Sequence, residues 1–214
     1  MIQQIITLTC QRYPNMQLNS RNITVGSAMT RNSGILHREI LHASLHNADY
    51  KLVEKITFKG QPLGRFAVAI GYNPALLDFN HIDKTNELIA DYLYSLGYAG
   101  YYLLNLLPDV SHQKPNKSAS NFNDFYQIIE IALANLPQIS SMDLFIFWGS
   151  SVYVNSKEKI AFDGMLSRFA SSYTIGTSKA KHKHPGRGVN SSTILRHVVN
   201  APLALTNSIN GYLR

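Results

Sequence analysis

Residues 65–76 read RFAVAIGYNPAL, and this stretch decides the fold class that the sequence predicts. The run FAVAI has no polar residue at alternate positions, which is typical of a strand that is covered on both faces. A glycine, a tyrosine, an asparagine and a proline follow it directly. A buried strand that ends in a polar turn indicates a parallel sheet with a ligand site at the edge where its strands end.

Three more apolar runs of strand length follow, and helical patterns separate them. The predicted strands lie at about residues 65–71, 101–107, 143–149 and 173–177. After the first strand we expect a helix with Asn80 as its N-cap, Asp83 in its first turn and Gly97 at its end. Its apolar residues recur at helical spacing: Ile82, Ile89, Leu93 and Leu96. Further helices are expected over residues 125–136 and 156–170.

This alternation of strands and helices predicts one α/β domain over residues 1–214. The expected fold is a three-layer α/β/α arrangement with a central, mostly parallel sheet of about four strands. Residues 61–190 form its core and residues 191–214 a C-terminal segment. Residues 1–60 are an N-terminal extension, with a hairpin or helix around residues 35–45 and a turn at Lys59–Gly60, and they either extend the sheet or cap it.

Composition limits the class of protein. The chain has 214 residues, of which 45% are hydrophobic and 15% charged, which suits one compact domain. Its apolar runs are far shorter than the roughly 18 residues of a membrane span, and the N-terminus has no secretion-signal pattern. Cys10 is the only cysteine, so no internal disulfide can form. We therefore expect a cytoplasmic protein without membrane contact.

The net charge of +7 is concentrated in one part of the chain. Residues 164–214 contain seven Lys and Arg residues and no acidic residue, whereas residues 1–163 are balanced. Clustered cations gain free energy by displacing counterions from a polyanion, so Lys181, Lys183 and Arg187 are candidate nucleic-acid contacts. A solvated basic face that keeps the protein in solution is an equally good interpretation of charge alone.

Polar and aromatic residues follow the predicted strands at their carboxyl ends. They are Tyr72, Asn73 and Pro74 after the first strand, Asn105 on the second, Trp148 and Gly149 on the third, and His184 after the fourth. Strands of a parallel sheet end at one edge, so these residues are expected to converge on a ligand. Each also has a structural alternative: Asn73-Pro74 as an ordinary turn, Asn105 bonded to backbone, and Trp148 packed in the core.

The sequence lacks the motifs of several common kinds of catalytic or cofactor site. No Cys, His and carboxylate set has the spacing of a zinc site, so we predict no metal. The stretch GSS at residues 149–151 lacks the second glycine of a G-x-S-x-G nucleophile turn. Phosphate-binding loops of the Walker or dinucleotide type are absent as well, so no nucleotide cofactor is expected.

Four motifs occur in an order that resembles an uncharacterised bacterial family, a domain of unknown function. They are GYNPALLDFNHIDKT, LGYAGYYLLNLLP, DLFIFWG and HPGRG, and together they cover about residues 60–190. The resemblance implies matching positions in an NP turn, a D-x-T helix start, an NL strand, a WG strand end and an HP motif. These positions are Asn73-Pro74, Asp83 with Thr85, Asn105, Trp148-Gly149 and His184.

The chain is also similar, more distantly, to the uracil-DNA glycosylase-like proteins, which have a small α/β/α fold. That resemblance implies that Asn73 positions a water molecule and that His184 hydrogen-bonds the departing base. Ala75 stands where the mismatch-specific branch has glycine, and the residues after Pro185 replace a serine-containing loop. The cysteines of the iron–sulfur branches are absent, since Cys10 is the only one.

Base excision passes through an oxocarbenium-like sugar and needs a placed water and a stabilised leaving group. Asp83 is a candidate catalytic base and Asp78 a second carboxylate near the substrate. Tyr72 or Trp148 are candidate stacking faces for a flipped-out base. The leading hypothesis is therefore a nucleobase glycosylase that acts on nucleic acid, with DNA preferred over RNA. The alternatives are a non-catalytic nucleic-acid or nucleotide-binding module and an enzyme for a small nucleoside-like metabolite.

Overall fold

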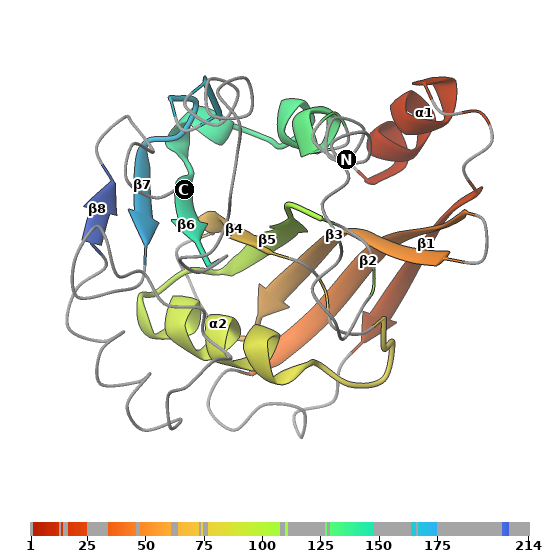
Figure 1. The fold of residues 1–214 in the computed structure, drawn as a ribbon. Helices are drawn as coiled ribbons and strands as arrows, with labels where there is room; N and C mark the ends of the chain where they lie inside the picture. The colour runs from red at the N-terminus through yellow and green to blue at the C-terminus, as the bar shows by residue number, and fades with distance from the viewer. Residues whose placement is uncertain are drawn as a thin grey trace.

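Among the described residues, eight strands form a single mixed sheet in the order β1-β2-β3-β5-β4-β6-β7-β8 (Figure 1). The computed structural model describes residues 2–12, 14, 17–24, 34–45, 48–60, 64–72, 74, 77–107, 110, 127, 129–147, 164–165, 167–174 and 203–205. The strands are β1 (Gln17–Thr24), β2 (Ile35–Leu45), β3 (Ala48–Phe58), β4 (Phe66–Gly71), β5 (Gly100–Asn105), β6 (Asp143–Ile146), β7 (Ser171–Thr174) and β8 (Leu203–Leu205). The helices are α1 (Ile2–Arg12), α2 (Lys84–Ser95) and the 3₁₀ helix η1 (Ile139–Ser141), and residues 127 and 129–134 are helical as well.

The predicted fold class is wrong, because the sheet is larger and mixed. The four strands expected from the apolar runs are present as β4, β5, β6 and β7, and they run parallel to one another. However, β1, β2 and β3 join them through the antiparallel pairing of β3 with β5, and β8 pairs antiparallel with β7. Within residues 1–60, β1, β2 and β3 therefore extend the sheet, residues 2–12 form α1, and residues 35–45 are a strand. Charged side chains inside β2 and β3 hid the strand pattern.

Two hydrophobic clusters lie on opposite faces of the sheet. On one face α2 packs Leu88, Ile89 and Leu93 over the small residues Ala67 and Ala69 of β4. On the other face, Val68 and Ile70 of β4 belong to a cluster with Ile129, Ala132 and Leu133, and Ile5 of α1 belongs to the same cluster. Figure 1 shows α1 near β1 on this face. None of the described helices is long and apolar enough to cross a membrane. The expected helix at 156–170 falls mostly outside the described residues, with only 164 and 165 helical.

The order of the parallel strands creates a point where chain connections diverge. From β4 the chain passes through α2 to β5 on one side, and from β5 it returns past residues 129–134 to β6 on the other side of β4. The two connections cover opposite faces of the sheet. In open α/β sheets, ligands bind at the carboxyl ends of the strands at such a point. In this protein it lies between β4 and β6.

The N-cap of α2 differs from the one that the sequence predicts. Asp83 is the cap, and its side-chain oxygen accepts a hydrogen bond from the Asn86 N–H at 2.9 Å. Asn80 instead donates its backbone N–H to Asp78 Oδ1 at 2.7 Å in a turn before the helix. Ile82 therefore lies outside α2, which ends at Ser95 with Gly97 at a φ of 82° just beyond it.

The opposite edge of the parallel strands, where they begin, is fixed by one buried carboxylate. Asp143, the first residue of β6, is 3% exposed and pairs with Arg65 Nη2 at 2.6 Å. The Tyr98 hydroxyl donates to the same carboxylate oxygen. Burial raises the pKa of Tyr98 further above its ordinary value, so this phenol stays protonated. This arrangement joins β4, β5 and β6 at the end away from the candidate site.

Gly100→Ala should lower the free energy of unfolding by about 2 kcal/mol, because overpacking a tight interior site costs about that much. A Cβ at residue 100 would lie 2.2 Å from the Ile56 carbonyl oxygen and 2.5 Å from the Phe66 ring. Urea denaturation measures the loss. The control is Gly164→Ala, where a Cβ would meet nothing within 4 Å. Equal transition midpoints for the two variants would contradict this account of Gly100.

Candidate functional site

The ends of the three central strands stay side by side beyond their last residues. Leu106 donates its N–H to the Gly71 carbonyl at 3.1 Å, and Leu107 donates to the Tyr72 carbonyl at 2.9 Å. On the other side Phe147 donates to the carbonyl of Ile70, a β4 residue, at 2.8 Å. These bonds build one continuous carboxyl edge from β5 through β4 to β6. The segments that follow β4 and β6 thus leave the sheet from neighbouring positions.

Asn105 and Gly71 form the tightest contact of this edge. A Cβ on Gly71 would lie only 2.6 Å from the Asn105 side-chain oxygen, so any larger residue at position 71 would have to displace the Asn105 amide. Asn105 is 5% exposed. Because side chains alternate along β5, it faces the α2 side, as Tyr101 and Leu103 do. A buried amide at a strand end is suited to hydrogen-bond a ligand.

Tyr72 belongs to the core on the opposite face. It lies in the hydrophobic cluster with Val68 and Ile70 and is 7% exposed. Burial raises the pKa of its hydroxyl, so the phenol is neutral. Pro74 is buried as well. The structure therefore brings Tyr72 and Asn105 to the same edge but aims them at opposite faces of the sheet.

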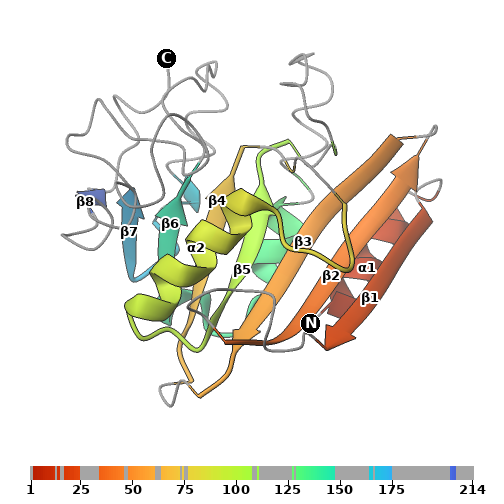
Figure 2. The ribbon, with the colours of Figure 1, turned by 90° about the horizontal axis from the view of Figure 1, so that it is seen from below.

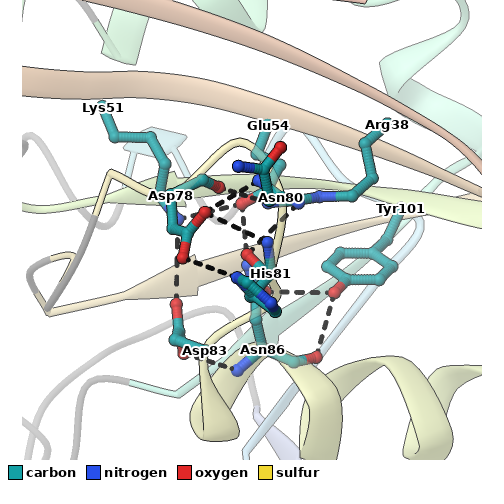
Figure 3. Close-up of polar contacts among 9 residues, drawn as sticks. All are labelled: Arg38, Lys51, Glu54, Asp78, Asn80, His81, Asp83, Asn86 and Tyr101. Carbon is teal, nitrogen blue, oxygen red and sulfur yellow. Dashed lines mark hydrogen bonds and ion pairs between the residues drawn. The ribbon is translucent and has the colours of Figure 1, made fainter. Parts of the chain in front are cut away.

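A buried carboxylate, Glu54 on β3, organises the face covered by α2 (Figure 3). Its side chain is fully buried. Arg38 Nε donates to Oε1 at 2.8 Å, and Lys51 Nζ donates to Oε2 at 2.9 Å. Burial by itself raises the pKa of Glu54, but the Lys51 and Arg38 cations outweigh it and lower the pKa from 4.5 to about 2. Glu54 is therefore ionised at neutral pH.

A β-bulge makes this ion pair possible. Leu41 of β2 pairs with Val53 and His42 with Lys51, so Leu52 has no partner across the strand pair. Leu52 and Val53 both enter the cluster on the α1 face. Residues three apart in a regular strand face opposite sides, yet the bulge turns Lys51 and Glu54 to the same side.

The network continues into α2. Asn86 Nδ2 donates to Glu54 Oε2 at 2.7 Å, and the Tyr101 hydroxyl donates to Asn86 Oδ1 at 3.1 Å. Lys51 Nζ also lies 3.8 Å from Asp83 Oδ2. Three strands, β2, β3 and β5, and the first turn of α2 are thus joined through one set of polar side chains (Figure 3).

Residues 77–83, which we call the pre-helix segment, cross the face of β3 and β2 before α2 begins (Figure 2). Arg38 donates to the carbonyls of His81 and Asp78 at 3.3 and 3.4 Å. The Arg21 guanidinium lies 4.5 Å from the centre of the Phe79 ring. Side chains of β1 and β2 therefore fix the path of this segment.

Asp78 is used within its own turn. Its Oδ1 accepts the backbone N–H groups of Asn80 and His81 at 2.7 and 3.1 Å, and its Oδ2 lies 3.0 Å from His81 Nδ1. The Asn80 N–H, with smaller contributions from His81, lowers the pKa of this carboxyl. Asp83 is likewise occupied on one oxygen by its cap. Thr85 is half-buried in the first turn of α2.

The predicted site residues thus fall into two described groups. Tyr72, Pro74 and Asn105 lie at the carboxyl edge, and Asp78, Asp83 and Thr85 lie at the start of α2. The others lie outside the described residues: Asn73, Trp148, Gly149, Lys181, Lys183, His184 and Arg187. Arg168, one of the basic residues of the last quarter, pairs with Glu130 at 2.6 Å. No three metal-ligating side chains gather within the part of the chain that the structure describes.

Sequence reasoning missed the buried network. Its unpredicted members are Arg38, Lys51, Glu54, Asn86 and Tyr101. The available signal was the pattern KLVE at residues 51–54, in which two charges enclose two adjacent apolar residues inside a strand. Such a break in alternation indicates a bulge. It does not identify the partner cation on β2.

Comparison with known proteins identifies the family. A family model described as a protein of unknown function, DUF1643, matches residues 51–185. The chain belongs to this family. The expected resemblance to an uncharacterised family is confirmed, and no resemblance to uracil-DNA glycosylases is shown. No curated protein matches the chain.

One solved structure shows a loose likeness. It is the crystal structure of a candidate acetyl xylan esterase from Bacteroides fragilis, with a TM-score of 0.43 and 7% sequence identity. The match covers 94% of this chain and 66% of the esterase chain. A likeness at this level carries no functional inference.

Glu54→Gln should lower the free energy of unfolding at pH 7 by about 3 kcal/mol, because it removes the buried counter-charge of Arg38 and leaves Lys51 with only Asp83 at 3.8 Å. Urea denaturation across a pH series checks this. The pKa of Glu54 is lowered in the folded state, so its contribution is complete above pH 4.5 and is lost as the pH falls towards 2. The difference between the wild type and the variant should therefore shrink in that range.

The control for this prediction is Glu87→Gln. Glu87 pairs with Lys84 at 2.8 Å on the exposed side of α2, and such pairs contribute less than about 1 kcal/mol. If the two substitutions cost the same, or if the cost of Glu54→Gln does not change between pH 4.5 and 2, the buried network does not have the role described here.

Proposed function

We propose that this chain is a nucleic-acid-processing hydrolase that cleaves the N-glycosidic bond between a nucleobase and its deoxyribose. The proposed site is the carboxyl edge at β4. The observation that carries the proposal is the strand order β5-β4-β6, which places the connections after β4 and β6 at the point where they diverge. Asn73 comes two residues after the end of β4, and Trp148 comes two residues after the end of β6.

In the proposed reaction, the oxygen of a water molecule bonds to the anomeric carbon of the sugar while the bond to the base breaks. The Asn73 amide orients the water, and Asp83 accepts its proton. Asp83 is preferred to Asp78, whose two oxygens are both used in its own turn. His184 donates a hydrogen bond to the leaving base, which stabilises the charge that develops on it.

Recognition of the base is assigned to Asn105, Trp148 and Gly149. An amide offers one acceptor and two donors, which suits the edge of a nucleobase. Asn105 is buried beside Gly71, so its orientation is restricted before a ligand arrives. Trp148 supplies a stacking face for a flipped base. Lys181, Lys183 and Arg187 hold phosphates of the strand.

Asn73→Ala should abolish release of uracil from a labelled single-stranded DNA while leaving DNA affinity within about twofold, because the amide acts on the water and not on the phosphates. Base release is measured by strand cleavage after alkali, and affinity by fluorescence anisotropy. Asn80→Ala is the matched control, since Asn80 is an exposed amide of the same connection. Equal loss of binding and turnover in Asn73→Ala would rule out the catalytic role.

The triple variant Lys181→Ala, Lys183→Ala, Arg187→Ala should bind DNA more weakly and with a salt slope reduced by about two to three, because each phosphate contact releases counterions. Anisotropy titrations from low to physiological salt measure the slope. A control with the same charge change replaces Arg12, Lys59 and Lys84, which are exposed on other parts of the protein. If both triple variants change the slope equally, the basic segment is only a solvated face.

A further inference from the structure

The bulge at Leu52 places a lysine where a regular strand would not. Lys51 is 3% exposed and lies level with the carboxyl end of β5, because Val53 pairs with Leu104 and β3 runs antiparallel to β5. Its ammonium group lies between two carboxylates, with Glu54 Oε2 at 2.9 Å and Asp83 Oδ2 at 3.8 Å. Bulges near functional sites commonly re-aim a side chain in this way.

We propose that Lys51 is a positioning residue that holds the carboxylate of Asp83 and, through it, the beginning of α2 at the carboxyl edge. Asp83 has two restraints on its side chain. Oδ1 accepts the Asn86 N–H at 2.9 Å, which belongs to its own helix, and Oδ2 faces Lys51, which belongs to the sheet. Only the second restraint relates Asp83 to β3.

The charge balance of the network supports this assignment. Arg38 and Lys51 are two buried cations, and Glu54 supplies one negative charge between them. A buried cation without a counter-charge is costly, so a second carboxylate beside Lys51 is favoured. Asp83 is the carboxylate within 4 Å of Lys51 besides Glu54 among the described residues. The need to balance the buried charge of Lys51 is therefore linked to the position of the partly exposed Asp83 carboxylate.

The functional meaning of this role rests on the proposed function, in which Asp83 accepts the proton of the attacking water. The structural role of Lys51 does not rest on the proposed function, because it concerns only how firmly Asp83 is held. The two parts can be tested separately. Exchange of the Asn86 amide reports the cap directly, since its N–H bonds to Asp83 Oδ1.

Lys51→Met should raise the hydrogen-exchange rate of the Asn86 amide about tenfold without a matching rise at the Phe147 amide of the β6 end. Methionine keeps the length of the side chain and removes its charge, and Glu54 keeps its bonds to Arg38 and Asn86. Lys51→Arg should restore protection. Native-state hydrogen exchange followed by NMR measures both amides.

The matched control is Lys84→Met, which removes an exposed lysine from the first turn of the same helix. It should leave the Asn86 amide unchanged. If Lys51→Met does not fold, Asp83→Asn replaces it as the test, with Asp78→Asn as control. The amide of asparagine keeps the cap but loses the charge, and only the change at residue 83 should increase exchange at Asn86.

The role of Lys51 is disproved if Lys51→Met leaves Asn86 exchange at the wild-type rate, or raises it equally with Phe147 as global destabilisation would. With base release as a second readout, Lys51→Met should lower kcat with little change in KM, and Lys51→Arg should recover it. A protein that shows the exchange effect but no base release would retain the positioning role and lose the proposed reaction.

Discussion

The charged carboxylate of Glu54 in the protein interior is the constraint on which the surrounding structure depends. An ion without partners in this place would cost several kcal/mol, so its three polar partners are a condition for folding. Two of them are cations from β2 and β3, and one is the Asn86 amide of α2. The two cations exceed the single charge of Glu54, and the excess accounts for the approach of Asp83 to Lys51. The charge balance around Glu54 thus determines where α2 begins.

This chain of contacts shows why the antiparallel strands matter for the candidate site. The pre-helix segment lies between β4 and α2 in sequence, yet its restraints come from Arg21 on β1 and Arg38 on β2. The family match begins at Lys51 and therefore includes both Lys51 and Glu54 but not Arg38. In this chain the matched region contains the bulge at Leu52, while β2, which lies before it in sequence, supplies the second cation.

The sequence predicted the parts of the fold that depend on local pattern. Unbroken apolar runs located β4 and β5, because both strands are buried on both faces. Helical periodicity located α2, although Asn80 was expected as its cap and the structure has Asp83, which accepts the Asn86 N–H and lies 3.8 Å from Lys51. The antiparallel strands were missed because buried charges such as Glu54 resemble surface residues until their partners are known. Of the site, the edge around Asn105 was predictable from topology, whereas the pairing of Lys51 with Glu54 required the bulge.

The strand order also relates the basic residues of the last quarter of the chain to the carboxyl edge of the sheet. β7 is parallel to β6 and pairs with it from Asp143–Ser171 to Ile146–Thr174, so both strands end at the same edge. The sequence after Thr174 contains six of the seven basic residues of the last quarter and no acidic residue. The seventh, Arg168, precedes β7 and is already paired with Glu130. Five of these six residues lie in sequence between β7 and β8, and the segment that carries them leaves β7 at the edge where β4, β5 and β6 end.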